Sequence, residues 1–327
     1  MSEITKVKTA NHEEWLKLRS QYIGGSDAAA VVGLNPFASP YSLWAEKTGK
    51  VPGFAGNLAT ETGTYLEEFI AKKFEQITGK KVRRCNHSFL NSDYPFAIAN
   101  IDREIVGEDA GLECKSTSVL NTRRFKNGDF PENYYCQCVH YLGVTEKKRW
   151  YIAVLIGNSD FKIFQMTRVA SDRCPEWCES SVYIEDAEIA ALMVEEADFW
   201  ELVKKDTPPA VDGIKATSEA LVAVYANSNY AVVDLNEFSF DMRKYSALKE
   251  QIKELETQAN EIVNRVKKFM GEAGRAECPE YKVSWKSQSK RMFDSKRFAR
   301  ENPDIDLSSY YNTSSTRVFR VTETKGV

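Results

Sequence analysis

Residues 96–116 read FAIANIDREIVGEDAGLECKS and decide the fold. The run divides into two apolar segments, 96–106 and 112–116, on either side of a short GEDAG stretch. Glycine at both ends of such a polar stretch is typical of a tight turn. We therefore expect a β-hairpin at this point of the chain.

Charged side chains interrupt this otherwise apolar hairpin. Successive side chains of a strand point to opposite faces, so Glu113 and Lys115 share one face and Cys114 points away. The turn brings Asp102 beside them. An unpaired buried charge is costly, and a bound metal ion is one way to offset that cost. The hairpin is therefore the first candidate for a functional site.

These residue types suit the hydrolysis of a phosphodiester. Two carboxylates, Asp102 and Glu113, can hold Mg²⁺, which stabilises developing negative charge and lowers the pKa of a water molecule. A lysine such as Lys115 can orient or deprotonate that water and stabilise the phosphorane. The backbone carbonyl of Cys114 is a further possible ligand. The spacing alone is common, and a surface hairpin with ordinary charges is the alternative.

A helix is expected upstream, from about residue 57 to residue 78. Its apolar stripe consists of Leu66, Phe69, Ile70, Phe74 and Ile77. At about 100° per residue, Glu67 lies at the edge of this stripe and Glu68 lies almost opposite. We therefore expect Glu67 to be the fourth catalytic residue, close to the metal, and Glu68 to face solvent.

The other elements up to residue 213 alternate between helix and strand. Helix starts are indicated by Ser26-Asp27 and by Ser39-Pro40. Further helices are expected at 131–144 and 185–205, and further strands at 81–87, 150–156 and 161–167. This order predicts a mixed α/β fold with a central mixed sheet flanked by helices. The proline-containing stretch 206–213 is the expected boundary of domain 1–213.

Residues 214–327 are expected to form an accessory region. A helix at about 239–270 carries apolar residues spaced alternately three and four apart, namely Tyr245, Leu248, Ile252, Leu255, Ala259, Ile262, Val266 and Phe269. We expect this stripe to pack within the chain, and a coiled coil with another chain is the alternative. Two strands, 281–285 and 316–321, are expected to bracket a short helix near 294–300.

Composition and charge set outer limits on function. The chain has 44 Lys and Arg against 47 Asp and Glu, a net charge of -3, which argues against binding nucleic acid through overall positive charge. Local basic segments such as 80–84 and 123–126 could still contact nucleic acid. Neither a secretory signal nor a membrane-length apolar run is visible, so we expect a cytoplasmic protein without a membrane partner.

The seven cysteines are expected to be free thiols. Their number is odd, and disulfides are rare in cytoplasmic proteins. The pairs Cys136/Cys138 and Cys174/Cys178 lack the C-x2-C spacing of zinc and iron–sulfur sites. Small buried thiols are therefore favoured over a metal–thiolate site.

Several motifs, in order along residues 12–205, carry a family resemblance. Asp102 with Glu113-x-Lys115, after a helical glutamate, resembles the restriction-endonuclease-like core of PD-(D/E)xK nucleases. The further motifs are Ile23-Gly-Gly-Ser-Asp27, Ser39-Pro-Tyr-Ser-Leu-Trp44, Gly63-x-x-x-Glu67, Ala99-Asn-Ile-Asp102 and Gln137-x-x-His140-Tyr141. Together they resemble the YqaJ-type viral recombinase family, relatives of phage lambda exonuclease.

The resemblance implies roles for individual residues. It implies metal binding by Asp102, Glu113 and the Cys114 carbonyl, with Lys115 as catalytic lysine and Glu67 as helical acid.

It also implies that Arg19 and Ser26 hold a terminal 5′-phosphate, and that Gln137 lies beside the active site. A phosphate beside Ser26 agrees with the free N–H groups at a helix start. Asp27, His140 and Tyr141 are expected to support the site, and core packing accounts equally well for His140 and Tyr141.

The function implied by the resemblance is 5′ to 3′ degradation of linear double-stranded DNA. The cofactor would be Mg²⁺, replaceable by Mn²⁺, with two ions per site. The protein would be a homo-oligomer, a ring-shaped trimer, and would work with a single-strand annealing protein in phage recombination. A PD-(D/E)xK endonuclease of restriction or repair type and a catalytically silent DNA-binding module are the alternatives.

Overall fold

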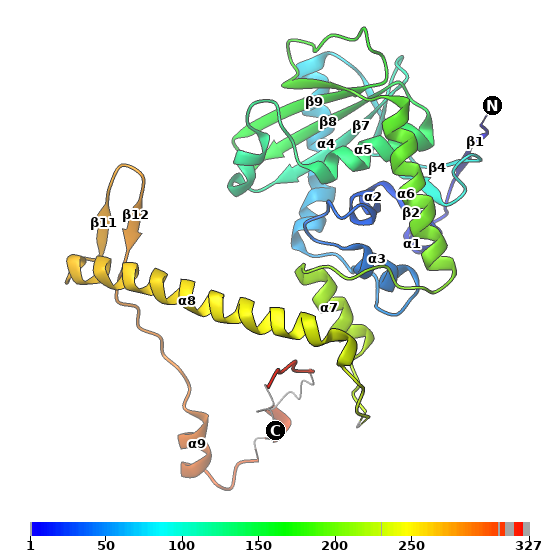
Figure 1. The fold of residues 1–327 in the computed structure, drawn as a ribbon. Coiled ribbons are helices and arrows are strands. Elements are labelled where there is room, and N and C mark those ends of the chain that lie inside the picture. The colour runs from blue at the N-terminus through cyan, green and yellow to red at the C-terminus, as the bar shows by residue number, and fades with distance from the viewer. Residues whose placement is uncertain (1, 230, 307, 311–316, 323–327) are drawn as a thin grey trace. The chain divides into compact units, whose positions relative to one another are not determined.

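The computed structural model describes residues 2–229, 231–306, 308–310 and 317–322. The chain divides into two compact units, one ending at Ala226 and the other beginning at Asn227 (Figure 1). The first unit thus extends past the boundary expected at residue 213. It does so because helix α7 (Lys215–Val224) packs on helix α3 (Pro40–Lys47), where the Thr217 hydroxyl donates to Ser39 Oγ at 2.7 Å.

A six-stranded sheet forms the centre of the first unit. Its strand order is β10-β9-β8-β7-β6-β3. Strands β7 and β8 run parallel, as do β9 and β10, whereas β6 runs antiparallel to β3 and β7 and β9 runs antiparallel to β8, so the sheet is mixed. The strands are β3 (Val82–Arg84), β6 (Arg103–Ile105), β7 (Ala110–Thr117), β8 (Arg149–Ile156), β9 (Asp160–Thr167) and β10 (Ser180–Tyr183). The predicted mixed α/β fold is confirmed, as is the predicted hairpin, formed by β6 and β7; the predicted strands 150–156 and 161–167 also pair as an antiparallel hairpin, β8 and β9.

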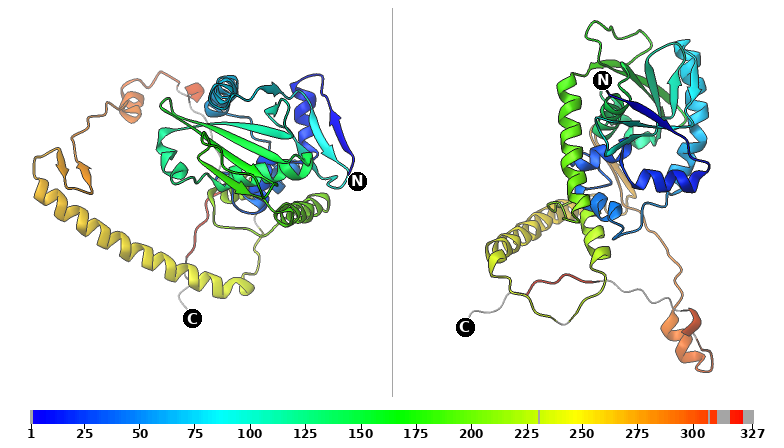
Figure 2. Two further views of the ribbon diagram at one scale, coloured as in Figure 1. Left: turned by 90° about the horizontal axis from the view of Figure 1, so that it is seen from above. Right: turned by 90° about the vertical axis from the view of Figure 1, so that its right-hand side faces the viewer.

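Two helices cover opposite faces of this sheet (Figures 1 and 2). Helix α4 (Leu58–Thr78) begins at Asn57, ends at Gly79 as predicted, and packs Ile70 and Phe74 against one face. Helix α5 (Glu132–Thr145) packs against the other face. Leu112 and Cys114 belong to the core beneath α4, so Glu113 and Lys115 face α5.

The apolar run 96–106 is two strands, and the prediction of a single strand was wrong. Strand β5 (Ala97–Ala99) lies in a second sheet of order β1-β4-β5-β2, whereas β6 lies in the large sheet. The Tyr141 hydroxyl donates to the Asn100 carbonyl at 2.8 Å, and the Cys85 N–H donates to the Asp102 carbonyl. These two hydrogen bonds satisfy the carbonyl groups of Asn100 and Asp102. The chain between β5 and β6 therefore does not need to continue the strand pairing of β5.

The other strands of the second sheet are β1 (Ile4–Val7), β2 (Ile23–Gly24) and β4 (Ser88–Asn91). Strand β1, next to the N-terminus, forms the edge beside β4 (Figure 2).

The N-terminal helices are α1 (His12–Ser20) and α2 (Gly25–Val31). The predicted cap of α2 was wrong by two residues: Gly24 is the N-cap, and the Asp27 carboxylate accepts from its N–H at 3.1 Å. Gly25 is required because a Cβ there would lie 2.5 Å from the Tyr141 ring. Helix α6 (Asp186–Lys204) and the short helix η1 (Val119–Phe125) complete the first unit.

The second unit contains the predicted long helix, α8 (Ser239–Met270), preceded by η2 (Asn236–Phe238). The hairpin β11 (Arg275–Glu277) with β12 (Lys282–Ser284) follows, and then α9 (Ser295–Glu301) and η3 (Ser308–Tyr310). Residues 317–322 form neither helix nor strand, so the described part of the expected strand 316–321 is absent; Thr316 lies outside the described residues.

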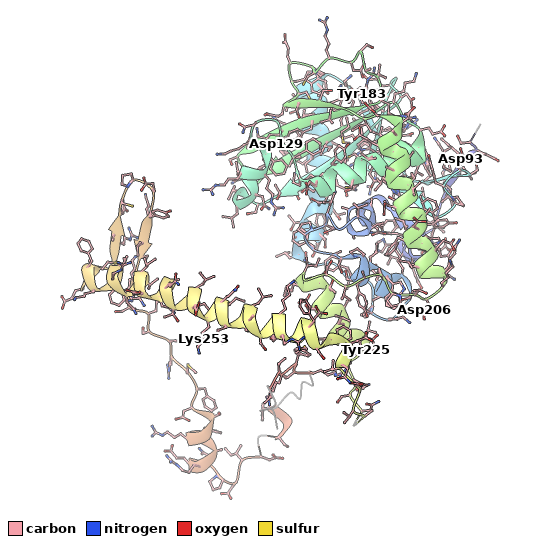
Figure 3. The ribbon with its side chains drawn as sticks, in the orientation of Figure 1. Asp93, Asp129, Tyr183, Asp206, Tyr225 and Lys253 are labelled. Atoms are coloured by element: carbon pink, nitrogen blue, oxygen red, sulfur yellow. The ribbon has the colours of Figure 1, made fainter. Side chains whose placement is uncertain are left out.

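The side chains along α8 are largely exposed, including Lys253 at its middle (Figure 3). Leu248, Ile252 and Leu255 of the apolar stripe are exposed by 48%, 45% and 62%. The packing of this stripe within the chain or against another chain stays a prediction. Among the described helices, none is both long and apolar enough to cross a membrane.

Candidate active site

Asp102 lies against strand β7 at the start of β6. Its Oδ2 accepts a hydrogen bond from the Cys114 N–H at 2.7 Å, which holds the carboxylate next to Glu113. Burial, followed by the charges of Glu113 and Glu67, raises the pKa of Asp102 well above its usual range. The structure therefore brings together three carboxylates whose like charges oppose one another.

Glu113, Lys115 and Gln137 form a closed set of polar contacts between β7 and α5. Lys115 Nζ lies 2.7 Å from Glu113 Oε1 and donates to Gln137 Oε1 at 2.8 Å. The Gln137 amide donates to the same Glu113 oxygen at 2.8 Å. The second oxygen, Glu113 Oε2, is buried and has no hydrogen-bond partner among the described residues. This oxygen is free to bind a ligand.

Lys115 is held as an ammonium ion. Burial opposes its charge, but Glu113 and Asp102 outweigh burial and raise the pKa of the amine. Its Nζ also lies 5.1 Å from the centre of the Tyr134 ring, a cation–π arrangement. The amine thus has fixed partners on several sides and points into the carboxylate group.

Helix α4 contributes Glu67 from its edge. The side chain of Glu67 is 27% exposed and that of Glu68 is 61% exposed, in the order expected from the helix faces. Glu68 does not simply face solvent, however, because its Oε2 lies 3.2 Å from Arg103 Nη2. The same guanidinium lies 3.7 Å from Glu67 and donates to the Asp102 carbonyl at 2.9 Å.

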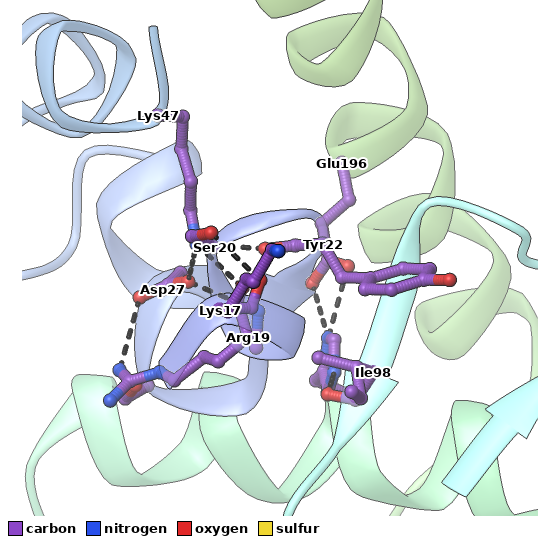
Figure 4. Close-up of polar contacts among 11 residues, drawn as sticks. Lys17, Arg19, Ser20, Tyr22, Asp27, Lys47, Ile98 and Glu196 are labelled. Carbon is purple, nitrogen blue, oxygen red and sulfur yellow. Dashed lines mark hydrogen bonds and ion pairs between the residues drawn. The ribbon is translucent and has the colours of Figure 1, made fainter. Parts of the chain in front are cut away.

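Two residues expected to bind phosphate, Arg19 and Ser26, also lie together, and Figure 4 shows Arg19 and Lys47 next to Asp27. Arg19 Nη2 donates to Ser26 Oγ at 2.7 Å and lies 3.6 Å from Asp27 Oδ1. Lys47 Nζ lies 2.8 Å from Asp27 Oδ2 and donates to the Tyr22 carbonyl at 2.7 Å. Burial opposes ionisation of Asp27, but Lys47 and Arg19 outweigh it and lower the pKa of this carboxyl. Asp27 therefore holds Arg19 beside Ser26.

Tyr141 and His140 connect the site to the core. Gln137 donates to the Tyr141 hydroxyl at 2.8 Å, and that hydroxyl donates to Asn100 beside Asp102. His140 is fully buried between the Glu196 carboxylate, 2.9 Å from Nδ1, and the Ile98 carbonyl, 3.0 Å from Nε2 (Figure 4). Oxygen atoms lie beside both ring nitrogens, and the charge of Glu196 outweighs burial and raises the pKa of His140.

Sequence reasoning missed two buried cations, Arg103 and Lys47, whose side chains are 4% and 3% exposed. Arg103 could have been found, because it lies in the same apolar run that drew attention to Asp102. Lys47 sits at the end of an ordinary-looking helix and carries no local signal. The sequence also did not reveal a pocket of about 550 Å³, which is lined by Glu67, Asp102 and Trp15 among others.

The donor set fits a hard divalent cation. Asp102, Glu67 and Glu113 provide carboxylate oxygens, the ligands that Mg²⁺ and Mn²⁺ prefer. The buried Glu113 oxygen, which has no partner in the part of the chain that the structure describes, and the raised pKa of Asp102 both indicate an excess of negative charge in this group. A bound cation would neutralise that excess.

The fold and the site together define a protein with a PD-(D/E)xK-type core: a mixed sheet, flanked by helices, that carries an aspartate and a Glu-x-Lys pair on adjoining strands. Residues 14–148 match the profile of the family described as YqaJ-like viral recombinase domain. The chain is also 36% identical over 308 residues to the uncharacterized protein YqaJ of Bacillus subtilis (strain 168), covering 92% of each chain. The chain belongs to the YqaJ family.

Solved structures with a partly similar fold include two exonucleases. The alkaline exonuclease of Laribacter hongkongensis aligns over 60% of this chain and 94% of its own, with a TM-score of 0.47 and 17% identity. A phage-related exonuclease from Haemophilus somnus 129PT aligns over 59% and 99%, with a TM-score of 0.39 and 11% identity.

Proposed function

We propose that this protein is a metal-dependent DNA nuclease, and specifically an exonuclease that degrades linear double-stranded DNA from 5′ ends for single-strand-annealing recombination. One observation carries the proposal: Glu113 offers a buried oxygen without a partner among the described residues, next to Asp102, Glu67 and a fixed lysine. Membership of a family of viral recombinases supports a DNA substrate.

Asp102 and Glu113 would hold the ion, with the Cys114 carbonyl as a further ligand and Glu67 binding directly or through water. We propose Mg²⁺, replaceable by Mn²⁺, with two ions per site. When bound, such an ion supplies positive charge for the pentacovalent phosphorane and lowers the pKa of the attacking water.

The chain's own residues orient the reaction. Glu113 and Gln137 keep the Lys115 ammonium at one point, from which it can donate to a nonbridging phosphate oxygen and stabilise the charge that gathers there. Gln137, on α5, donates both to Glu113 of β7 and to the Tyr141 hydroxyl, which in turn donates to the Asn100 carbonyl close to Asp102. The lysine and the carboxylates thus reach the phosphate from fixed positions.

Arg19 and Ser26 would bind the terminal 5′-phosphate. A guanidinium and a hydroxyl 2.7 Å apart can share one phosphate, and Arg19 is well suited to phosphate because its N–H groups form a planar fork. Asp27, held by Lys47, keeps the guanidinium in place. Recognition of this group would make free 5′ ends the preferred substrate.

The resemblance to lambda exonuclease relatives further supports a homo-oligomer, trimeric by that resemblance, and an annealing protein as partner. Mass photometry of the full chain tests the trimer. A monomer in the presence and absence of DNA contradicts it.

The deciding experiment compares linear, nicked and covalently closed duplexes of one sequence. With Mg²⁺ or Mn²⁺, the linear duplex should be degraded and the closed circle left intact, and a chelator should stop the reaction. Lys115→Ala, prepared in the same way, controls for contaminating nuclease. Rapid attack on closed circles would instead make the protein an endonuclease, and binding without cleavage would make it a silent DNA-binding module.

A further inference from the structure

A second group of metal-ligating side chains lies outside the carboxylate group. Cys85, His87 and Glu104 each offer a ligand atom, and these atoms all lie within 4.8 Å of one another. Cys85 and His87 belong to the segment after β3, and Glu104 lies on β6, the strand that pairs with β3. We propose that this group binds a thiophilic divalent cation, Zn²⁺, at a site separate from that of Mg²⁺.

The distance between the sulfur and the imidazole suits zinc. Cys85 Sγ lies 3.6 Å from Nε2 and 3.7 Å from Nδ1 of His87. In a tetrahedral site with Zn–S of about 2.3 Å and Zn–N of about 2.0 Å, the two ligand atoms are about 3.5 Å apart. A rotation of the His87 ring that aims one nitrogen at the ion is therefore the main adjustment this pair needs.

The backbone around the group is already fixed. Arg83 pairs with Glu104 in the sheet, and the Cys85 N–H donates to the Asp102 carbonyl at 3.3 Å. Ligands on a fixed frame lose little conformational freedom when the ion binds. Cys85 and His87 also line the pocket of about 550 Å³, which leaves room for a water molecule as fourth ligand.

The charges around Glu104 decide how tightly an ion binds. Its carboxylate lies 2.8 Å from Arg83, 3.3 Å from Lys147 and 3.9 Å from Lys6. These cations repel Zn²⁺, but the Cys85 thiol releases its proton on binding and adds a negative charge. Lys6 is the most distant cation, and its side chain is 52% exposed, so it can turn into solvent. Replacing Lys6 by a neutral residue should therefore strengthen binding.

The ligand types distinguish this site from the carboxylate group. A thiolate and an imidazole select zinc, cobalt or a similar ion, whereas three carboxylates select Mg²⁺ or Mn²⁺. Zinc bound here would fix the position of segment 85–88, which forms one wall of the pocket that Glu67 and Asp102 also line. The inference does not rest on the proposed nuclease activity.

Cobalt substitution tests the site directly. The full chain, reduced and stripped with a chelator, is titrated with Co²⁺ and then with Zn²⁺. We expect a thiolate-to-cobalt charge-transfer band in the near ultraviolet, removed by about one equivalent of Zn²⁺ and unaffected by excess Mg²⁺. Carboxylates alone produce no such band, so binding at Asp102 and Glu113 does not interfere.

Variants locate the site. Cys85→Ser should abolish the band and His87→Ala should weaken cobalt binding at least tenfold, whereas Cys278→Ser, at an exposed cysteine of the second unit, should leave both unchanged. Lys6→Gln should tighten binding severalfold. The absence of a band in the unaltered protein, or its persistence in Cys85→Ser, overturns the proposal. If Cys85→Ser fails to fold, His87→Ala decides, and unchanged cobalt affinity in that variant overturns it.

Discussion

Two adjacent glutamates on α4 offer the sharpest test of the active site. We expect Glu67→Gln to lower the rate of DNA cleavage at least about 100-fold, equivalent to about 2.7 kcal/mol of activation free energy. Glu67 lies close enough to Asp102 and Glu113 for their charges to interact, and burial and Glu113 raise its pKa although Arg103 opposes them. Loss of its charge therefore acts on the carboxylate group itself.

Glu68→Gln is the matched control, with the same chemical change one residue further along. Glu68 contacts Lys72 at 3.3 Å and Arg103 at 3.2 Å, but its side chain is 61% exposed and that of Lys72 is 67% exposed. The Glu68–Lys72 pair joins two exposed groups, and such pairs contribute about 0–1 kcal/mol to stability, while the buried Arg103 keeps its contacts with Glu67 and the Asp102 carbonyl. We expect a loss of unfolding free energy within that range and a cleavage rate within about twofold of the unaltered protein.

The assay measures initial rates on a linear 5′-phosphorylated duplex at several Mg²⁺ concentrations, together with thermal unfolding of each variant. Glu67→Gln should also require more Mg²⁺ for its half-maximal rate. An inactive Glu68→Gln beside an active Glu67→Gln would reverse the helix-face reasoning. Equal loss in both variants would show that Arg103, which contacts both glutamates, carries the effect.

Three further predictions concern the catalytic lysine, the phosphate-binding residues and the pH dependence of stability. Lys115→Ala should abolish cleavage while DNA binding by gel shift and Mn²⁺ binding by calorimetry persist; loss of both binding activities would indicate a structural role instead. Arg19→Ala should slow turnover at least about tenfold more on 5′-phosphorylated than on 5′-hydroxyl ends, and equal loss on both counts against phosphate recognition. The lowered pKa of Asp27 means that its contribution to stability is present above its usual value near 3.8 and is lost as the pH falls through the lowered pKa. Asp27→Asn should therefore unfold at a lower temperature at pH 7, with the difference shrinking in acid, and a constant difference across this range would refute the ion-pair argument.

Much of the fold follows from local patterns in the sequence. Residues only a few positions apart determine the apolar stripe of α4, its ends at Asn57 and Gly79, and the turn before β7. The break at Asn100 could not be predicted in this way. It depends on a hydrogen bond from Tyr141, 41 positions further along the chain, and local patterns do not report such distant partners.

The sequence by itself determined which face of β7 carries Glu113 and Lys115 and which edge of α4 carries Glu67, because side-chain direction follows directly from strand and helix geometry. Only the tertiary structure decided that Arg103 lies between Glu67 and Glu68, that Lys47 holds Asp27, and that Glu104 meets Cys85 and His87. Those contacts join segments from different elements, and the packing of the whole core sets the distance between them. A pattern along the sequence does not contain that distance.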